Sequence, residues 1–324
     1  MLRQSSDQAV LQGPAAQENG SAEEELWLLG QPPLKDYFHF VEDQRVSHQG
    51  LDGAAAARAA RDEWQAANAY YQELERTEAG AANLAQRLEL DASMAGLAAE
   101  LRSHPRFRRS YDSLPTAIEM VALDHLMVFQ HHVSRNFVDS LQGRIGRSPD
   151  PAALFGFCLP LGEREAPVEI RRVGSRRYAF RCQSTDFRYL ESKLLRPEQL
   201  VGCEPAGPLA GVVALMVGFG PNFLSAIATG KRLLLNNGYH RACALRAAGL
   251  THAPCIVQTA GSVDELELVA KTEITDDPQF YFESARPPLL KDFFNPRIRK
   301  LVPVRRRTRV IEVNFDIDDF MVDE

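Results

Sequence analysis

The chain has 324 residues, of which 45% are hydrophobic and 25% charged, and its net charge at neutral pH is −6. This length suits one large domain or two ordinary ones, and the composition is that of a globular protein. The acidic balance argues against a protein that binds nucleic acid over its whole surface, because such binding needs a surplus of Lys and Arg.

The first 146 residues are expected to form a polar disordered segment and then a helical domain. Residues 1–25 are rich in Gln, Ser, Gly and Glu and lack the apolar content that offsets ordering entropy, so we expect them to be disordered. Residues 26–146 read as a helical domain because of their helix-forming and apolar-periodic segments. We expect helices over Gly53–Glu78, capped by Asp52, over Ala81–Arg102, and from Thr116 towards Ile145.

The last of these helices would carry three histidines, His125, His131 and His132. A metal or haem site on such a helix can be imagined. The segment is apolar nearly all round, however, as a buried helix should be. We therefore favour hydrogen-bonded histidines in the core.

After Pro151 the pattern changes to short strands and helices, and residues 151–290 are expected to form a mixed α/β domain. Residues 291–324 are expected to hold a basic strand, near Arg309–Phe315, and an acidic tail. The predicted class is thus α+β. The elements expected between these limits are a hairpin (Val168–Gln183), a buried strand (Val212–Val217), one or two helical turns (Phe223–Ala228), a strand (Arg232–Asn236), a helix (Tyr239–Ala248), a strand (Ala253–Gln258) and a short helix (Val263–Lys271).

The five cysteines form no Cys-x-x-Cys pair and no zinc-ligand spacing. An odd number without a disulfide-like layout suits a reducing compartment, and we expect small buried side chains in a cytoplasmic protein. The most apolar stretch, Pro208–Ala228, is interrupted by glycines and a proline, so we expect no membrane partner.

The best candidate for a binding site is the turn Asn237-Gly238-Tyr239-His240-Arg241 between the expected strand and helix. Gly238 permits an unusual backbone conformation and a close ligand approach. The helix that follows has amides without intrahelical partners at its positive end, which attract anions. His240 and Arg241 add donors, and Asn237 can cap the helix. A plain strand-turn-helix connection would use the same residues, and on spacing alone it is the commoner explanation.

The 28 residues from Gly230 to Val257, GKRLLLNNGYHRACALRAAGLTHAPCIV, resemble the core of the ParB/sulfiredoxin-like superfamily. That core typically has a strand ending in an acidic or amide residue and Gly, a polar-His-Arg or similar turn, a helix ending Ala-Ala-Gly, and a strand with an early Pro. The matching positions here are Asn237, Gly238, His240, Arg241, Ala247, Ala248, Gly249, Pro254 and Val257. The resemblance implies a ParB/sulfiredoxin-like fold for residues 151–290.

The chain departs from this family at the position after Gly238. Sulfiredoxins place a catalytic Cys there and ParB partition proteins an acidic residue, whereas this chain has Tyr239. The ParB-like free-serine kinases carry a turn of the type Asp-Gly-His-His-Arg, and this chain lacks its Asp. Sulfinic-acid reduction is therefore not expected, and no helix-turn-helix pattern follows Val257.

The function that we expect is binding of a nucleotide or phosphorylated small molecule at the Gly238 turn, with phosphoryl transfer as the only chemistry considered. Asn237, Gly238, Tyr239, His240 and Arg241 are the expected ligand-binding residues, and His240 is the candidate acid or base. ATP or another nucleotide with Mg²⁺ would suit this turn, although the sequence identifies neither the ligand nor metal ligands. The Gly218-Phe-Gly-Pro-Asn222 segment could form one wall of the site.

The alternative is a non-catalytic regulator that binds nucleic acid or an acidic protein through its basic segments. Nucleic acid is the less favoured partner, since the basic residues are not interleaved with aromatic ones and an acidic tail can pair with them. The basic residues lie on the expected hairpin (Arg171, Arg172, Arg176, Arg177, Arg181) and near the end of the chain (Arg297, Arg299, Lys300, Arg305, Arg306, Arg307, Arg309).

Overall fold

The structure is a computed structural model that describes residues 23–31, 33–45, 53–162, 166–184, 186–202, 207–270, 272–305 and 308–322. Its strands are β1 (Glu23–Leu28), β2 (Arg87–Leu88), β3 (Thr116–Ala122), β4 (His132–Ser134), β5 (Glu169–Gly174), β6 (Arg177–Cys182), β7 (Phe187–Leu195), β8 (Val212–Phe219), β9 (Ser225–Thr229), β10 (Arg232–Asn237), β11 (His252–Thr259), β12 (Arg299–Val304) and β13 (Arg309–Asn314). Its helices are α1 (Leu34–Arg45), α2 (Gly53–Thr77), α3 (Ala95–Ser103), α4 (Pro105–Ser110), α5 (Arg135–Ile145), α6 (Pro151–Cys158), α7 (Tyr239–Ala247), α8 (Val263–Val269), α9 (Thr272–Thr275) and α10 (Pro278–Glu283), with 3-10 turns η1 (Ala81–Leu84), η2 (Ala92–Met94), η3 (Pro197–Gln199) and η4 (Leu290–Phe294).

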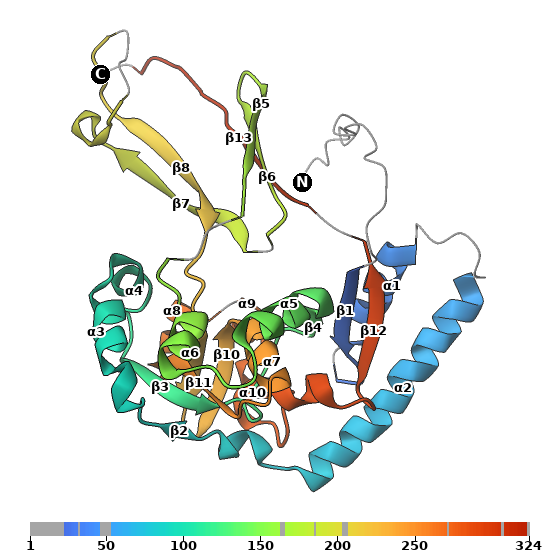
Figure 1. The fold of residues 1–324 in the computed structure, drawn as a ribbon. Coiled ribbons are helices and arrows are strands. Elements are labelled where there is room, and N and C mark those ends of the chain that lie inside the picture. Colours follow the sequence, from blue (N-terminus) through green and yellow to red (C-terminus); the bar gives the residue numbers. More distant parts are fainter. Residues whose placement is uncertain are drawn as a thin grey trace.

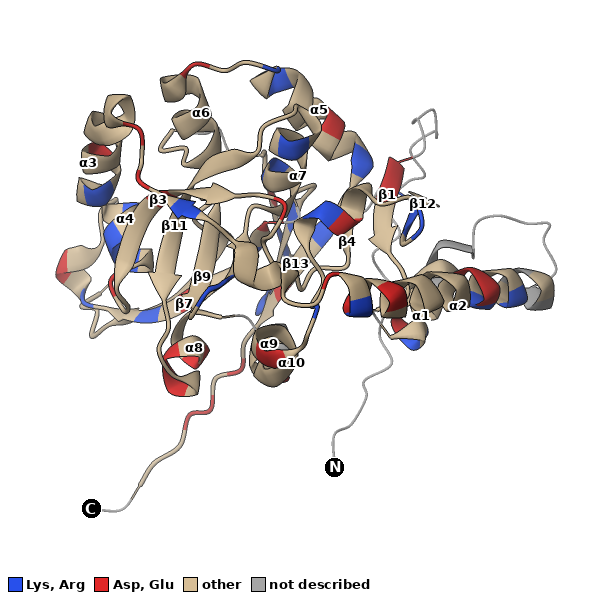
Figure 2. Ribbon diagram, turned by 90° about the horizontal axis from the view of Figure 1, so that it is seen from below, with Lys and Arg blue, Asp and Glu red and all other residues tan. Residues whose placement is uncertain are grey.

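A five-stranded sheet in the order β10-β9-β11-β3-β2 forms the centre of the molecule. Figure 2 shows this sheet between α5, α6 and α7 on one side and α8, α9 and α10 on the other. A second sheet, β12-β1-β4, lies beside α1 and α2, and the sheets β13-β6-β5 and β7-β8 form a lobe that projects from the body (Figure 1). The mixture of helices with mainly antiparallel sheets confirms the α+β class.

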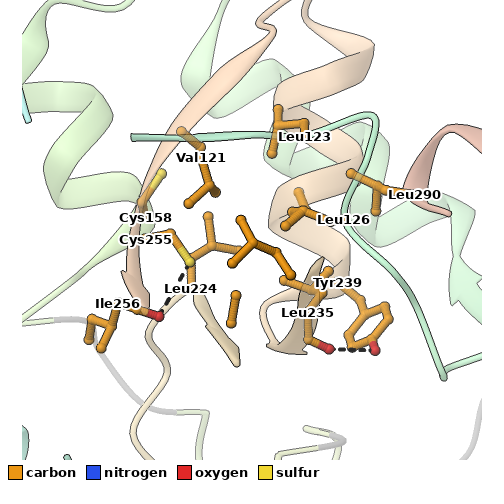
Figure 3. Close-up of a cluster of buried hydrophobic side chains, with 14 of the residues drawn as sticks. Val121, Leu123, Leu126, Cys158, Leu224, Leu235, Tyr239, Cys255, Ile256 and Leu290 are labelled. Atoms are coloured by element: carbon orange, nitrogen blue, oxygen red, sulfur yellow. Dashed lines mark hydrogen bonds between the residues drawn. The ribbon is translucent and has the colours of Figure 1, made fainter. Parts of the chain in front are cut away.

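The central core lies between the five-stranded sheet and its helices. Figure 3 shows part of it, where Cys255 donates from its thiol to the Ile256 carbonyl and Tyr239 donates to the Leu235 carbonyl. Cys158, Cys182, Cys243 and Cys255 are all buried and free, as expected for small core residues, whereas Cys203 lies outside the described residues. Burial of this apolar surface is the main source of stability here.

A smaller core joins β1 to α2. Trp27 and Tyr37 pack there with Tyr71 of α2. Gly30 lets the chain pass against this helix, because a Cβ there would lie 2.5 Å from the backbone carbonyl carbon of Ala67. The Asn68 side-chain amide donates to the Gly30 carbonyl at 2.5 Å, which fixes the crossing.

The expected helix over Gly53–Glu78 is present as α2, whereas two other helical predictions are wrong. The Ala81–Arg102 segment contains η1, β2, η2 and only the short helix α3. The Thr116–Ile145 segment is β3, a loop, β4 and α5, and its histidines lie outside any helix. An apolar run fits a strand that is covered on both faces as well as it fits a buried helix, and here pairing of β3 with β11 decides.

These strands change the expected domain plan. β2 and β3 belong to the same sheet as β9, β10 and β11, so residues 26–146 do not fold as a separate helical unit. Glu23–Glu25 begin β1 and are ordered into a sheet, and residues 1–22 and the expected cap Asp52 lie outside the described residues.

In the second half most expected elements are present. The hairpin β5–β6, the strands β10, β11 and β13 and the helices α7 and α8 lie where the patterns placed them. Phe223–Ala228, expected as helical turns, is instead loop and strand β9, because it pairs with both β10 and β11. β8 is a strand but not a buried one, since Val213 is 73% exposed on the projecting lobe.

Candidate functional site

The predicted turn lies at the end of β10, where the chain enters α7. Gly238 has φ +93°, a left-handed conformation that other residues resist, and a Cβ at this position would lie 2.7 Å from Leu224 Cδ1. The first intrahelical bond of this helix runs from the Ala242 amide to the Gly238 carbonyl. Since glycine has no side chain, it provides no cap for the first turn. The positive end of α7 is therefore built without a side-chain acceptor of its own.

Asn237 and Arg241 both hold the segment that precedes β9. The Asn237 side-chain amide donates to the Pro221 carbonyl at 3.0 Å. The Arg241 guanidinium, only 4% exposed, donates from Nη1 to the Asn222 carbonyl and, at 2.8 Å, to the Asn222 side-chain oxygen. The Gly220-Pro221-Asn222 segment thus forms a wall beside the first turn of α7, as the sequence suggested.

Arg188 of β7 is a further cation at this wall, and no sequence motif singled it out. A Cβ on Gly220 would overlap the Arg188 guanidinium, so this glycine leaves the space that the arginine occupies. Pairing of Arg188 with Gly218 across the β7–β8 sheet brings it beside Gly220, which follows it by 32 residues in the chain. Its side chain is 41% exposed and lies 3.5 Å from Asp186.

Tyr239 faces the core and not the surface of the turn. It is 3% exposed, and its hydroxyl donates to the Leu235 carbonyl at 2.7 Å while accepting from the Phe129 amide at 3.2 Å. Its ring meets that of Phe129 edge-on. These contacts assign the Tyr239 side chain to packing, although its backbone amide belongs to the first turn of α7.

His240 points towards the start of α5. Its Nε2 accepts a hydrogen bond from the Ser134 amide at 3.0 Å, and its ring lies edge-on to Phe137. Burial, with smaller contributions from the nearby His132 and Arg241, lowers the pKa of His240 to about 4 against the opposing effect of Glu25. The ring is therefore neutral at pH 7 with its proton on Nδ1. In this arrangement Nε2 is occupied by the protein.

Three arginines of the basic hairpin of the alternative function are paired within the lobe. Arg171 is bound by Glu169, Arg177 donates to Glu312 at 2.6 Å, and Arg176 lies 4.0 Å from Asp316. The acidic end of the chain thus neutralises part of the hairpin. This pairing lowers the positive potential that a nucleic acid would meet.

The part of the chain that the structure describes contains no cluster of three or more His, Cys, Asp or Glu side chains that could hold a metal. Within the same residues, no helix is both long and apolar enough to span a bilayer. His132, one of the three histidines considered, instead bonds Glu25 through Nδ1 at 2.5 Å and stacks on Trp27.

Comparison with models of known protein families, with curated proteins and with solved structures gave no match.

Proposed function

We propose that the protein binds a nucleotide or another phosphorylated small molecule at the first turn of α7. The observation that carries this proposal is the left-handed Gly238, which starts the helix without a capping side chain and places Arg241 in the same turn. A phosphate would accept from the backbone amides of this turn, aligned with the positive end of the helix dipole. We also propose that the protein is cytoplasmic. Phosphate binding at the Gly238 turn agrees with the resemblance of this turn to those of ParB-like proteins.

Two guanidinium groups support an anionic ligand at this place. Arg241 lies within the turn, and Arg188 lies against Gly220 of the adjoining wall. Arginine is well suited to phosphate because its planar fork donates two parallel hydrogen bonds. In the structure Arg241 donates to Asn222, so a bound phosphate would replace neutral oxygens as the acceptor of these bonds.

The proposed function is ligand binding, and a reaction of the bound ligand is a separate question. Proton transfer by His240 would require its Nε2 to exchange the Ser134 amide for a ligand atom, and its low pKa makes it a weak base. Phosphoryl transfer, with Mg²⁺ brought by the nucleotide, is the chemistry to examine once a ligand is found.

Thermal unfolding against a panel of nucleotides and inorganic phosphate, with and without Mg²⁺, tests this proposal. A ligand that binds only the folded state stabilises it by about 2.7 kcal/mol at a hundred times its dissociation constant. We expect Arg188→Gln to weaken the shift and Arg241→Lys to weaken it more, since lysine cannot donate in the same bidentate manner. Arg188→Gln is the cleaner variant because this side chain is partly exposed and Arg241 is buried.

Arg246→Gln is the matched control. Arg246 lies in the last turn of α7, where it pairs with Asp124 and covers Phe294, and its loss should leave the ligand shift intact. A stabilising shift that both Arg188→Gln and Arg241→Lys leave unchanged would overturn the site. No shift with any phosphate ligand would overturn the binding proposal, and salt-sensitive DNA binding would then favour the regulator.

A further inference from the structure

A separate cavity of about 300 Å³ opens on another part of α7, between this helix, α5 and η4. Its volume lies at the lower end of the range for small-molecule sites, about 300–1,000 Å³. Cys243 and Ala247, one and two turns after Tyr239, contribute to its lining. It is therefore distinct from the first turn of the helix.

The deep part of the cavity is apolar. Leu26, Val133, Val138, Cys243 and Phe293 line it, and each of these side chains is less than a tenth exposed. Burial raises the pKa of the Cys243 thiol to about 12, so this group is an uncharged, weakly polar part of the wall at neutral pH. A ligand that fills this floor must present a compact apolar body.

In the described part of the chain, the rim of the cavity has two arginines, and only one of them is paired with a carboxylate at the rim. Arg135 donates from Nε to both oxygens of Asp139, each at 2.8 Å, and forms a neutral pair. Arg299 donates from Nη1 to the Phe293 carbonyl at 3.1 Å, which holds its guanidinium beside the cavity. Among the described residues no carboxylate forms an ion pair with Arg299, so the rim has one net positive charge.

We propose that this cavity binds a small monocarboxylate whose body is aromatic or branched aliphatic. The carboxylate would accept from the Arg299 guanidinium, and the body would rest on Val138, Cys243 and Phe293. A guanidinium at the mouth of an apolar pocket is suited to this combination because a charge-assisted bond orients the ligand while apolar contact adds affinity. An amino acid zwitterion fits less well, since Asp139, the carboxylate at the rim, is already engaged by Arg135.

Fluorine NMR of 4-fluorophenylacetate in the presence of the full chain is the test, with 4-fluorophenylacetamide as its neutral counterpart. We expect the fluorine signal of the acid to broaden as protein is added, and an excess of phenylacetate to restore it. The amide should bind at least about tenfold more weakly, because a hydrogen bond between charged groups contributes that much more than one to a neutral group.

Two variants and one control locate the binding. Arg299→Gln should weaken binding of the acid about tenfold and leave the amide unchanged. Ala247→Phe should abolish binding of both, since the new ring would fill the cavity from its partly exposed side. Arg297→Gln, two positions from Arg299, removes an arginine that lies 3.5 Å over the Tyr70 ring and outside the cavity lining, and it should change nothing. Circular dichroism confirms that each variant is folded.

No broadening at millimolar acid with folded protein would overturn the proposal. Equal broadening by acid and amide would overturn the role of Arg299, and binding that survives Ala247→Phe would overturn the location. Because the probe carries no phosphate, its failure says nothing about the first turn of α7, and failure of nucleotide binding leaves the cavity unaffected.

Discussion

Two regions of the molecule each contain a buried arginine, which is held differently in each. One region is the junction between α2 and η4, and the other is the first turn of α7. Arg286, 1% exposed, donates to both oxygens of Asp292, itself 2% exposed, and at 2.9 Å to Glu78. Arg241 donates to the neutral oxygens of Asn222. A carboxylate that balances a buried charge cannot leave without a large penalty, whereas a neutral acceptor can be exchanged for an anion. The buried ion pair therefore stabilises the first region, whereas each bond from Arg241 to Asn222 can be exchanged for a bond to an anion.

The largest effect should come from breaking the first region. Arg286→Met leaves the Asp292 carboxylate buried without its counter-charge, and we expect a loss of about 3–5 kcal/mol in the free energy of unfolding, measured with urea. The double variant Arg286→Met/Asp292→Asn keeps an oxygen for the Leu289 amide and should recover part of this loss. If the single variant lost less than 1 kcal/mol, the contrast between the two arginines would fail.

The next effect tests the backbone of the second region. Gly249→Ala places a side chain at φ +92° with no atom within 4 Å, so it should cost about 1–2 kcal/mol for conformation alone. Gly238→Ala has a similar φ and also meets Leu224, and overpacking should add about 1–3 kcal/mol. Denaturant unfolding of both variants separates the two contributions. Equal losses would mean that Leu224 moves aside.

A smaller loss of folding stability is expected when the pH is lowered. The pKa of His240 is lowered from 6.5 to about 4 in the folded state, so the unfolded chain takes up a proton first as pH falls. Stability should therefore be fully present above pH 6.5 and decline between pH 6.5 and 4. His240→Gln should flatten this decline in unfolding midpoints measured against pH, leaving the part due to His131, whose pKa is also about 4, and to His125, whose pKa is also lowered by burial. His104→Gln, at an exposed helix cap, is the control and should keep the full decline.

The smallest effect should come from an exposed pair. Arg177 and Glu312 join β6 to β13 with partly exposed side chains, and solvent screens their attraction. Arg177→Gln should cost about 0.2–1 kcal/mol and lose most of its effect in high salt, as urea unfolding at two salt concentrations would reveal. A salt-independent loss would show that the arginine acts through packing.

Local chemistry in the sequence predicted those parts of the fold that are local. The apolar strand Leu233–Leu235, the glycine after it and the Ala-rich helix specified β10, the turn and α7 correctly. The same reasoning failed for Thr116–Ala122, because an apolar segment covered on both faces has no distinguishing period. Its pairing partner β11 lies more than 120 residues away, and no local rule supplies that information.

The site divides in the same way. Asn237, Gly238 and Arg241 are neighbours in the chain, so local sequence was enough to place them together at a helix start. Long-range packing, in contrast, turns Tyr239 into the core, places the Ser134 amide on His240 and brings Arg188 to Gly220. It also assembled the Arg299 cavity from separate segments. The physical reason is that side-chain direction and charge compensation depend on what packs against an element, which is set by contacts distant in the chain.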